Sequence, residues 1–362
     1  MTRDEERRPV LALVESNTTG TGRMFAAAAR ARELRPLLVS TRPERYPWVA
    51  DDAVETVLAD TSDTDAVVRA IRSAAMDGGE VAGVTTSSEY FVTVAAEAAA
   101  RLELPGPDPV AVGRCRDKRS QRNALAGAGV PVPAFVAAGT PDEAAAAAAV
   151  IGFPVVVKPA DGTGSRGVRL CRDAGEVRHH AGGLLDSGRD ERGQPARPAV
   201  LVEEYVSGPE FSVETFGTEV VGVTAKHLGA APWFVETGHD FPAEIPPPGG
   251  GGRVGAVAVA AVEALGLGFG PAHTEVRLDA GGPAVIEVNP RLAGGRIPTL
   301  VRLATGIDLV GATVDAVIGR AGPLPKPGPG HASIRFLVPA RAGRVRRTGG
   351  VAGAAGVPGV VD

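Results

Sequence analysis

The sequence predicts a protein of mixed α/β and α+β class, with a parallel α/β unit followed by two α+β lobes. Three observations predict this class. Short apolar strands alternate with helical segments over the first hundred residues. A β-branched strand from Val155 ends in a lysine and a glycine-rich loop, and residues His273 to Arg291 carry the pattern of a symmetrical hairpin.

Length and composition allow a large buried core. The chain has 362 residues, of which 44% are hydrophobic and 22% charged, so disorder is not expected. The formal net charge of −4 predicts no nucleic-acid partner. Two cysteines, Cys115 and Cys171, suggest neither a disulfide framework nor a metal cluster. No apolar run approaches the roughly 20 residues of a spanning helix, so we expect no membrane partner and a soluble, cytoplasmic protein.

The first strand, Val10–Val14, runs through a loop into a helix predicted over Arg23–Arg32. Gly20 and Gly22 in that loop resemble half of a dinucleotide fingerprint, but the third glycine is missing. A tight turn into a helix is therefore the favoured interpretation. Further apolar segments continue the alternation at Pro36–Val39, Val54–Leu58, Val67–Ala75 and Val81–Thr85.

Proline and glycine mark the expected divisions of the chain. After a helix over Phe91–Leu102, three prolines from Pro105 to Pro109 predict a stiff passage without a helix. Pro323–Gly330 predicts a linker. We expect an N-terminal α/β domain at 1–112, a small lobe with a phosphate flap at 113–204, a large lobe with a metal site at 205–322, and a linker and the start of a C-terminal piece at 323–362.

Other segments have simpler interpretations. Asp117–Ala128 and the alanine-rich Pro141–Ala149 are predicted to be helices. The polar segment Asp186–Pro198 is predicted to be a mobile surface loop.

The strand Val155–Val157 delivers Lys158 to a loop containing Gly162, Gly164 and Gly167. Glycines let backbone N–H groups turn toward an anion, and the lysine adds a point charge for phosphate oxygens. The alternative is an ordinary hairpin loop with a solvated lysine. No Gly-Lys-Ser/Thr follows, so this is not a Walker loop. The phosphate-binding element would be a strand-to-strand flap.

Two predicted strands flank the connection Ser207–Pro209 and carry several carboxylates. Taken alone, most of them would be surface charges. They are Glu203, Glu204, Glu210 and Glu214.

The alternating runs on either side of Asp279–Pro283 predict a hairpin whose register is symmetrical about Gly281. In that register Glu275 faces Glu287, and Asn289 lies on the same face as Glu287. Opposed carboxylates with Cβ atoms about 5 Å apart repel unless a cation lies between them. Carboxylate and amide oxygens suit Mg²⁺. The alternative is a pair of solvent-facing glutamates on an edge hairpin.

Together with Lys118, these motifs resemble the ATP-grasp superfamily in their order and spacing, over nearly the whole chain. The resemblance implies an ATP-grasp fold, in which two α+β lobes hold a nucleotide beside an N-terminal pre-ATP-grasp domain. It also implies ATP and one or two Mg²⁺ ions as cofactors, with Mn²⁺ as a substitute.

The resemblance gives each motif a role. Arg291 would be catalytic and would steady an acyl phosphate. The metal ligands would be Glu275, Glu287 and Asn289. The residues expected to bind ATP phosphates, adenine and ribose are Lys118, Lys158, Gly164, Ser165, Glu203, Glu204, Tyr205, Val206 and Glu210.

A narrower resemblance concerns residues 226–242 and 289–298, which look like the L-amino-acid ligases, a carboxylate-amine ligase branch that includes the bacilysin-forming dipeptide ligase and carnosine synthase. Glu236 would bind an ammonium, His239 would shape the pocket, and Arg296 would grip a carboxylate. The alternatives are a loop histidine and a surface charge. The expected substrate residues are Lys226, Glu236, His239, Gly294, Gly295 and Arg296.

The resemblance therefore implies an ADP-forming ligase that joins an amino acid carboxylate to an amine through an acyl phosphate. The expected partners are these two small molecules, and relatives are commonly homodimers. A bicarbonate-activating or purine-pathway enzyme of the same superfamily is an alternative, disfavoured by residues 226–242. A non-catalytic ATP-binding protein is another, disfavoured by the complete metal set. A composition rich in Ala, Gly, Arg and Val suggests natural-product biosynthesis.

Overall fold

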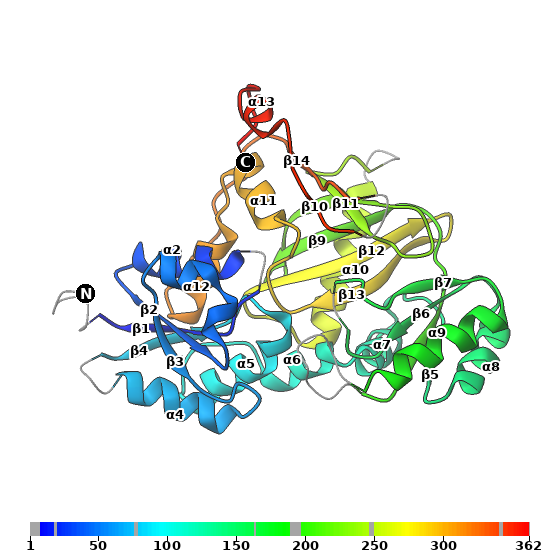
Figure 1. Ribbon diagram of the computed structural model, residues 1–362, viewed down its shortest axis with the longest axis horizontal. Coiled ribbons are helices and arrows are strands. Elements are labelled where there is room, and N and C mark those ends of the chain that lie inside the picture. The colour runs from blue at the N-terminus through cyan, green and yellow to red at the C-terminus, as the bar shows by residue number, and fades with distance from the viewer. Residues whose placement is uncertain are drawn as a thin grey trace.

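Three β-sheets organise the chain (Figure 1). The computed structural model describes residues 8–17, 20–75, 79–162, 164–188, 197–245, 250–339 and 343–361. The predicted surface loop Asp186–Pro198 lies largely outside the described residues, because 189–196 are among those left out. The predicted α/β and α+β class is confirmed, with one parallel sheet and two antiparallel sheets.

The first sheet is parallel, in the order β3-β2-β1-β4. Its strands are β1 (Val10–Val14), β2 (Arg35–Ser40), β3 (Glu55–Leu58) and β4 (Val81–Thr85). Helices cover both faces: α2 (Thr21–Arg30) and α12 (Leu309–Val317) lie on one, and α4 (Thr64–Ala75) and α5 (Val92–Arg101) on the other (Figure 1). The short helix α3 (Pro47–Asp51) follows β2.

The continuous apolar run of β1 follows from this coverage. Leu11 and Leu13 belong to the core beneath α2 and α12, whereas Val10, Ala12 and Val14 belong to the core beneath α4 and α5. A parallel strand buried on both faces needs no polar positions. The helix α12 comes from the far end of the sequence, so the first sheet is completed by residues that the sequence analysis assigned to the large lobe.

The second sheet is antiparallel, in the order β5-β8-β6-β7. Its strands are β5 (Phe135–Ala138), β6 (Val155–Pro159), β7 (Arg169–Cys171) and β8 (Val200–Glu204), and the helices α8 (Pro141–Ile151) and α9 (Ala174–Asp186) pack on it. The predicted alanine-rich helix is confirmed as α8. Thr140 caps it by accepting a hydrogen bond from the Glu143 N–H, and Pro141 occupies the first turn.

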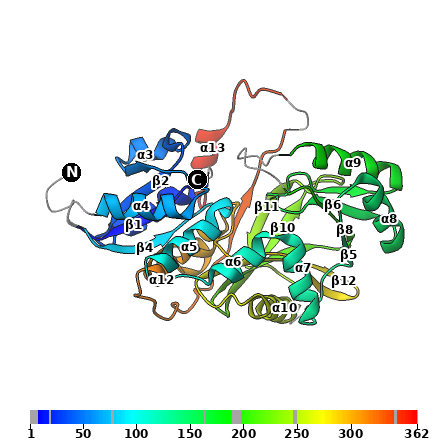
Figure 2. The same cartoon turned by 90° about the horizontal axis from the view of Figure 1, so that it is seen from below.

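The third sheet is antiparallel, in the order β13-β12-β9-β10-β11-β14. The helix α10 (Gly250–Leu265) packs against it, together with α6 (Pro109–Arg116) and α7 (Lys118–Gly127), while α11 (Ile297–Thr305) contacts β11 and β14. Figure 2 shows the same arrangement from below. The strands are β9 (Glu210–Phe216), β10 (Glu219–Leu228), β11 (Glu236–Phe241), β12 (Pro271–Asp279), β13 (Gly282–Asn289) and β14 (Ala332–Arg335).

The prediction of a helix-free passage through Pro109 is wrong. Pro109 occupies the first turn of α6, where its missing N–H has no intrahelical partner to lose, and Asp108 caps that helix by accepting from the Val110 N–H. Proline therefore starts the helix here instead of preventing it.

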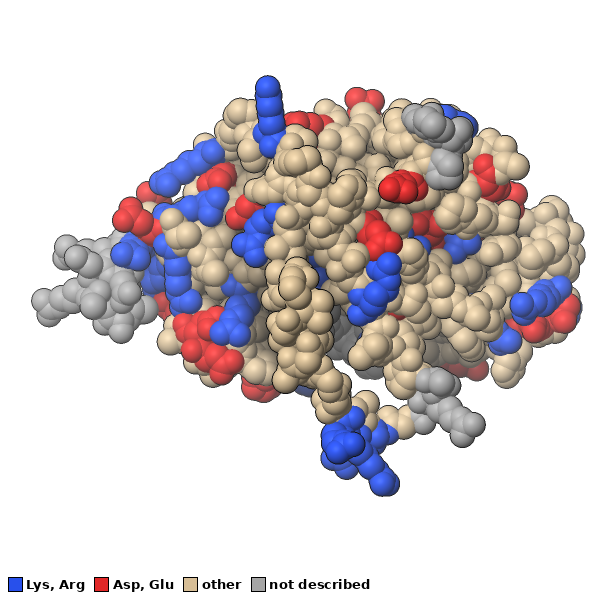
Figure 3. Space-filling model, turned by 90° about the horizontal axis from the view of Figure 1, so that it is seen from above, with Lys and Arg blue, Asp and Glu red and all other residues tan. Residues whose placement is uncertain are grey.

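The C-terminal segment adds an edge strand to the third sheet. β14 pairs with β11, and Arg335 donates to the Asp240 carboxylate at 2.6 Å. Beyond it, the described residues from 337 onward are exposed and include the short helix α13 (Val351–Ala355). Figure 3 shows acidic and basic side chains mixed over one face, with basic side chains projecting at its edges. Among the described helices, none is both long and apolar enough to cross a membrane.

A buried carboxylate fixes the loops at the carboxyl edge of the first sheet. Glu15 directly follows β1 in a left-handed conformation (φ 56°). It accepts hydrogen bonds from the hydroxyls of Ser40, Thr41, Tyr46 and Thr61 and from the Thr41 N–H, at 2.7 to 3.1 Å. Burial alone would raise the pKa of Glu15, but these donors outweigh it and lower the pKa.

Replacing Glu15 with Gln should destabilise the fold by about 2 kcal/mol at neutral pH, because an amide cannot accept from all these donors. The folded-state pKa is lowered, so the stabilisation is present above the ordinary carboxyl pKa and is lost as pH falls below it. Urea unfolding between pH 7 and pH 3 measures both effects. Glu103→Gln is the matched control, since Glu103 has the same backbone φ of 56° but is exposed. An equal loss in both variants would contradict the assignment.

Candidate active site

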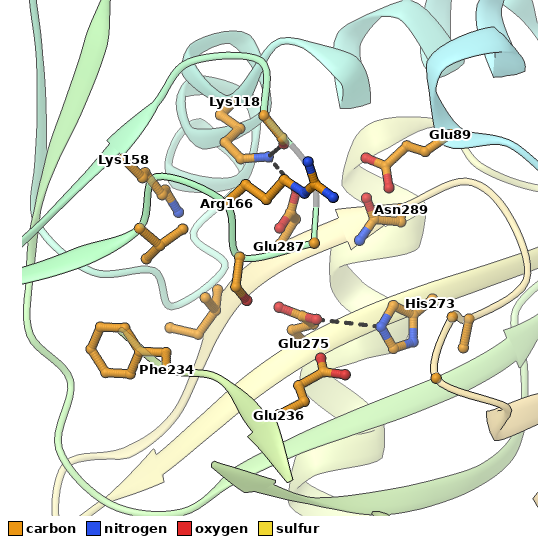
Figure 4. A pocket seen from close by; sticks show the side chains of 18 of the residues that line it. Glu89, Lys118, Lys158, Arg166, Phe234, Glu236, His273, Glu275, Glu287 and Asn289 are labelled. Carbon is orange, nitrogen blue, oxygen red and sulfur yellow. Dashed lines mark hydrogen bonds and ion pairs between the residues drawn. The ribbon is translucent and has the colours of Figure 1, made fainter. Parts of the chain in front are cut away.

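A cavity of about 630 Å³ is lined by residues from the regions of all three sheets (Figure 4). The first sheet contributes residues 87–90 after β4, the second contributes Lys158 and the flap after β6, and the third contributes the β12–β13 hairpin. Sequence motifs more than a hundred residues apart therefore face one space.

The β12–β13 hairpin places Glu275 directly opposite Glu287, as predicted. The predicted symmetry about Gly281 is nevertheless wrong at the turn, where Asp279 pairs with Gly282. A bulge at Ile286 shifts the register by one residue and brings the two glutamates together. Arg122 on α7 donates to the Ile286 carbonyl, so the extra residue is held by a side chain.

Each of the facing carboxylates is paired with a lysine. Lys226 on β10 donates to Glu275 at 2.6 Å, and Lys118, the first residue of α7, donates to Glu287. Asn289 points toward the same space as Glu287 (Figure 4). Among the described residues, no three His, Cys, Asp or Glu side chains form a ready metal site by themselves. Two carboxylates and one amide would need oxygen ligands from a substrate to complete the shell of a hard cation.

Lys226 is surrounded by three carboxylates. Its ammonium lies 2.8 Å from Glu210, 3.1 Å from Glu236 and 2.6 Å from Glu275. Burial would lower the pKa of Lys226, but the three carboxylates outweigh it and raise the pKa well above its usual value. Lys226 is not among the residues that line the cavity. It pairs with three carboxylates that do line the cavity, and the expectation that it contacts a substrate stays a prediction.

Lys158 is buried rather than solvated, which excludes the alternative of an ordinary exposed loop lysine. It pairs with Glu203 at 2.7 Å, and Glu203 also accepts from Arg122 at 2.8 Å. Burial lowers the pKa of Lys158 despite the attraction of Glu203. The pKa of Glu203 is lowered, because Arg122 and Lys158 outweigh the effect of its burial. The next residues of the chain, Glu204 to Val206, line the cavity.

The glycine-rich flap is anchored on both sides. Lys118 donates to the Gly162 carbonyl at 2.6 Å, and His180 on α9 lies 2.7 Å from the Gly167 carbonyl. Gly164, Ser165 and Arg166 line the cavity between these anchors. Figure 4 shows Arg166 extending across the space above Glu287.

Glu210 faces Arg277 across the β9–β12 register, and the Arg277 guanidinium donates to its carboxylate at 3.0 Å. The same guanidinium donates to the Val206 carbonyl at 3.1 Å and lies 5.4 and 5.1 Å from the ring centroids of Tyr205 and Phe234. These contacts join the β8–β9 connection to the third sheet.

Arg291 is held from the first sheet. Its guanidinium contacts the buried carboxylate of Glu89, which also accepts from Arg116 at 2.6 Å. Burial would raise the pKa of Glu89, but Arg291, Arg116 and Lys118 lower it to about 2. Glu89 is therefore charged at neutral pH. Figure 4 shows it beside Asn289, at the end of the cavity away from Phe234.

The remaining predicted substrate residues lie at different depths. Glu236, His239, Gly294 and Gly295 line the cavity. Arg296 does not: it is exposed, with a left-handed backbone (φ 65°), immediately before α11. The expectation that Arg296 binds a substrate carboxylate stays a prediction.

Several residues that line or support the cavity were not predicted from the sequence. Arg277 could have been found, because it lies two residues after Glu275 on the same strand and so on the same face. Glu89, Arg45 and Arg166 carry no comparable signal. Glu89 is 202 residues from Arg291 in sequence, and only the tertiary fold brings the two together.

Two family models match the chain. One, described as an ATP-grasp domain, matches residues 151–299, and the other, described as an ATP-grasp N-terminal domain, matches residues 25–106. An uncharacterized protein of Sinorhizobium fredii is 40% identical over 358 residues, which are 99% of this chain and 74% of that protein.

Two further comparisons concern characterised proteins. Carnosine synthase 1 of Gallus gallus is 33% identical over 193 residues, 51% of this chain but only 21% of that protein. The crystal structure of an L-amino acid ligase from Bacillus licheniformis superposes with a TM-score of 0.69 at 25% identity, covering 86% of this chain and 74% of that one. The chain thus spans about a fifth of the carnosine synthase.

Replacing Glu89 with Gln should destabilise the protein by about 3 kcal/mol at pH 7, because two partly buried arginines lose a buried counter-ion. The folded-state pKa of Glu89 is lowered to about 2, so its stabilisation is present above the ordinary carboxyl pKa and disappears as pH falls toward 2. Urea unfolding of both proteins between pH 7 and pH 3 should show the difference shrinking.

Glu55→Gln is the comparison variant, because Glu55 contacts the single arginine Arg35 and is partly exposed. It should cost no more than about 1 kcal/mol. A pH-independent loss in Glu89→Gln would contradict the charge-pair explanation.

Proposed function

The chain belongs to the ATP-grasp family, and from this membership and the geometry of the cavity we propose that it is an ATP-dependent carboxylate-amine ligase. The observation that carries the proposal is the convergence on one cavity of the facing pair Glu275 and Glu287, the lysines Lys118 and Lys158, and Arg291. Such a set can bind a nucleoside triphosphate, a divalent cation and an acyl phosphate side by side.

We propose that ATP lies between the second and third sheets. The connection Glu204–Val206 would meet adenine, and Glu210 would accept from the ribose hydroxyls. Lys118 and the flap would contact the phosphates. In support, the flap and the β8–β9 connection line the same cavity, and Arg277 links that connection to Glu210.

The donor set fits Mg²⁺. Glu275 and Glu287 are hard oxygen ligands in facing register, and Asn289 supplies an amide oxygen from the same strand as Glu287. These three residues would hold one or two Mg²⁺ ions, and Mn²⁺ could take the place of Mg²⁺. When bound, the metal would neutralise charge on the phosphates.

The reaction would have two steps. A carboxylate oxygen attacks the γ-phosphorus of ATP, forming an acyl phosphate and releasing ADP. An amine nitrogen then attacks the acyl carbon, and phosphate leaves. Arg291 would donate hydrogen bonds to the acyl phosphate oxygens as negative charge builds on them. Glu89 would act as a positioning residue that fixes the Arg291 guanidinium.

We propose that both substrates are small molecules of the amino acid class. Two similar proteins, a carnosine synthase and an L-amino acid ligase, support this class. Glu236 offers a carboxylate for an ammonium group, and its charge is maintained by Lys226. Arg296 would contact a substrate carboxylate only where the substrate extends past Gly295.

The test is phosphate release from MgATP with single amino acids and pairs of them, with ADP and AMP separated by chromatography. We expect ADP, phosphate and an amide product with particular pairs. EDTA should abolish turnover, and Mg²⁺ or Mn²⁺ should restore it. AMP as the product would contradict the acyl-phosphate route. A protein that binds MgATP but never turns over would contradict the ligase assignment.

Glu287→Gln should lower kcat by roughly 100-fold or more, since it removes one of two facing metal ligands and leaves Lys118 unpaired. Glu263→Gln is the matched control, because Glu263 is an exposed residue of α10, whose buried residues pack against the third sheet. Equal activity in the two variants would remove Glu287 from the metal site.

A further inference from the structure

One ring nitrogen of His239, Nδ1, has a defined hydrogen-bond partner. The imidazole is fully buried on β11, and its Nδ1 lies 3.1 Å from the Gly295 carbonyl oxygen. A carbonyl oxygen only accepts, so Nδ1 carries the hydrogen. In the neutral ring, Nε2 therefore presents a lone pair. Nε2 has no hydrogen-bond partner among the described residues, although His239 lines the cavity.

The nearest charged atom faces this lone pair. The Glu236 Oε2 lies 3.3 Å from Nε2 but makes no hydrogen bond with it. Two acceptors this close favour a donor with several hydrogens between them, and an ammonium group is such a donor. About a third of the Glu236 side chain is exposed, so this pair is accessible from the cavity side.

The ring is held in one orientation. Phe336, just after β14, packs edge-on against it with the ring centroids 5.3 Å apart. A Cβ at position 295 would lie 2.3 Å from the His239 Cε1, so the imidazole occupies the space that a side chain at Gly295 would need. The Gly295 backbone has a φ of 56°, which also favours glycine.

The charged groups around His239 come from three strands. Glu236 lies on β11 itself, with its carboxylate 3.3 Å from the His239 Nε2 and 3.1 Å from the Lys226 ammonium. Lys226 is opposite His239 on β10. Arg335 on β14 donates to the His239 carbonyl at 3.2 Å and to the Asp240 carboxylate. Arg335 is thus engaged with other groups, and Lys226 lies among its three carboxylates.

Glu236 and His239 lie near the residues that we propose bind the metal and the ATP phosphates. Glu236 and Glu275 share the Lys226 ammonium, at 3.1 and 2.6 Å. Lys226 therefore connects Glu236, which would hold the amine, to Glu275, which is a proposed metal ligand.

We propose that His239 is the catalytic base of the second step, accepting a proton at Nε2 from the ammonium of the amine substrate while Glu236 holds that ammonium. The inference rests on the proposed ligase function. The amine enters as R–NH₃⁺ and gives one proton to Nε2. Its nitrogen lone pair then forms the C–N bond, the bond from the acyl carbon to the phosphate oxygen breaks, and the second amine proton leaves with phosphate.

Hydroxylamine separates this role from the first step. It is largely unprotonated at neutral pH, so it traps an acyl phosphate as a hydroxamate without needing a base. In His239→Gln, amide formation should fall by about 100-fold, the usual scale of general base catalysis. Hydroxamate formation from the same carboxylate and MgATP should change by no more than about threefold.

The pH dependence gives a second readout. The amide-forming rate of His239→Gln should rise about tenfold per pH unit up to the pKa of the amine, because only free amine reacts, whereas the wild-type rate should level off earlier. His227→Gln is the matched control: His227 lies on β10, is partly exposed and does not line the cavity, so its rates should equal wild type.

The possible results distinguish a catalytic role of His239 from a binding role and from failure of the proposed ligase function. Equal loss of hydroxamate and amide in His239→Gln would overturn the proposal and assign His239 to binding of the carboxylate substrate. A parallel pH profile for variant and wild type would also overturn it. No hydroxamate from the wild-type protein with any carboxylate would instead overturn the ligase function itself. His239→Asn, tested in parallel, covers the case in which the Gln variant does not fold.

Discussion

One buried ammonium holds the chemistry of this cavity together. Glu210, Glu236 and Glu275 all lie within 3.1 Å of the Lys226 nitrogen, and without that charge the three carboxylates would repel one another. The three belong, by our proposal, to the ribose, the amine and the metal. The positions of the nucleotide, the cation and one substrate are therefore fixed relative to a single point on β10, which suits a reaction limited by alignment.

The second constraint is that the cavity is composite. Arg291 follows β13, yet its counter-ion Glu89 follows β4 of the first sheet. Arg122 on α7 binds both Glu203 in the second sheet and the bulge carbonyl in the third. Groups from different sheets are thus held together by charged side chains. A fold arranged this way couples the integrity of the cavity to the docking of all three sheets.

Much of this could be predicted from the sequence, and the limits have physical causes. Alternation with period two identified the hairpin and the facing pair Glu275 and Glu287, because strand geometry is local. It missed the bulge at Ile286, whose extra residue is stabilised by Arg122 from a distant helix. Nor could it show that Lys226 is buried and Arg296 exposed, since burial depends on tertiary packing. The role of Glu89 could not be predicted for the same reason, because only the tertiary fold brings it to Arg291.

The bulge also sets the phase of the hairpin independently of its tip. From Asp279 and Gly282 up to Val276 and Val285 the strands run in one register, and beyond Ile286 they run in another. The pairing at the turn and the pairing of the facing carboxylates are therefore set separately. A change of sequence in the turn would leave Glu275 opposite Glu287. Deleting the single bulged residue, Ile286, would instead move Glu287 out of alignment with Glu275 and leave the pairing nearer the turn intact.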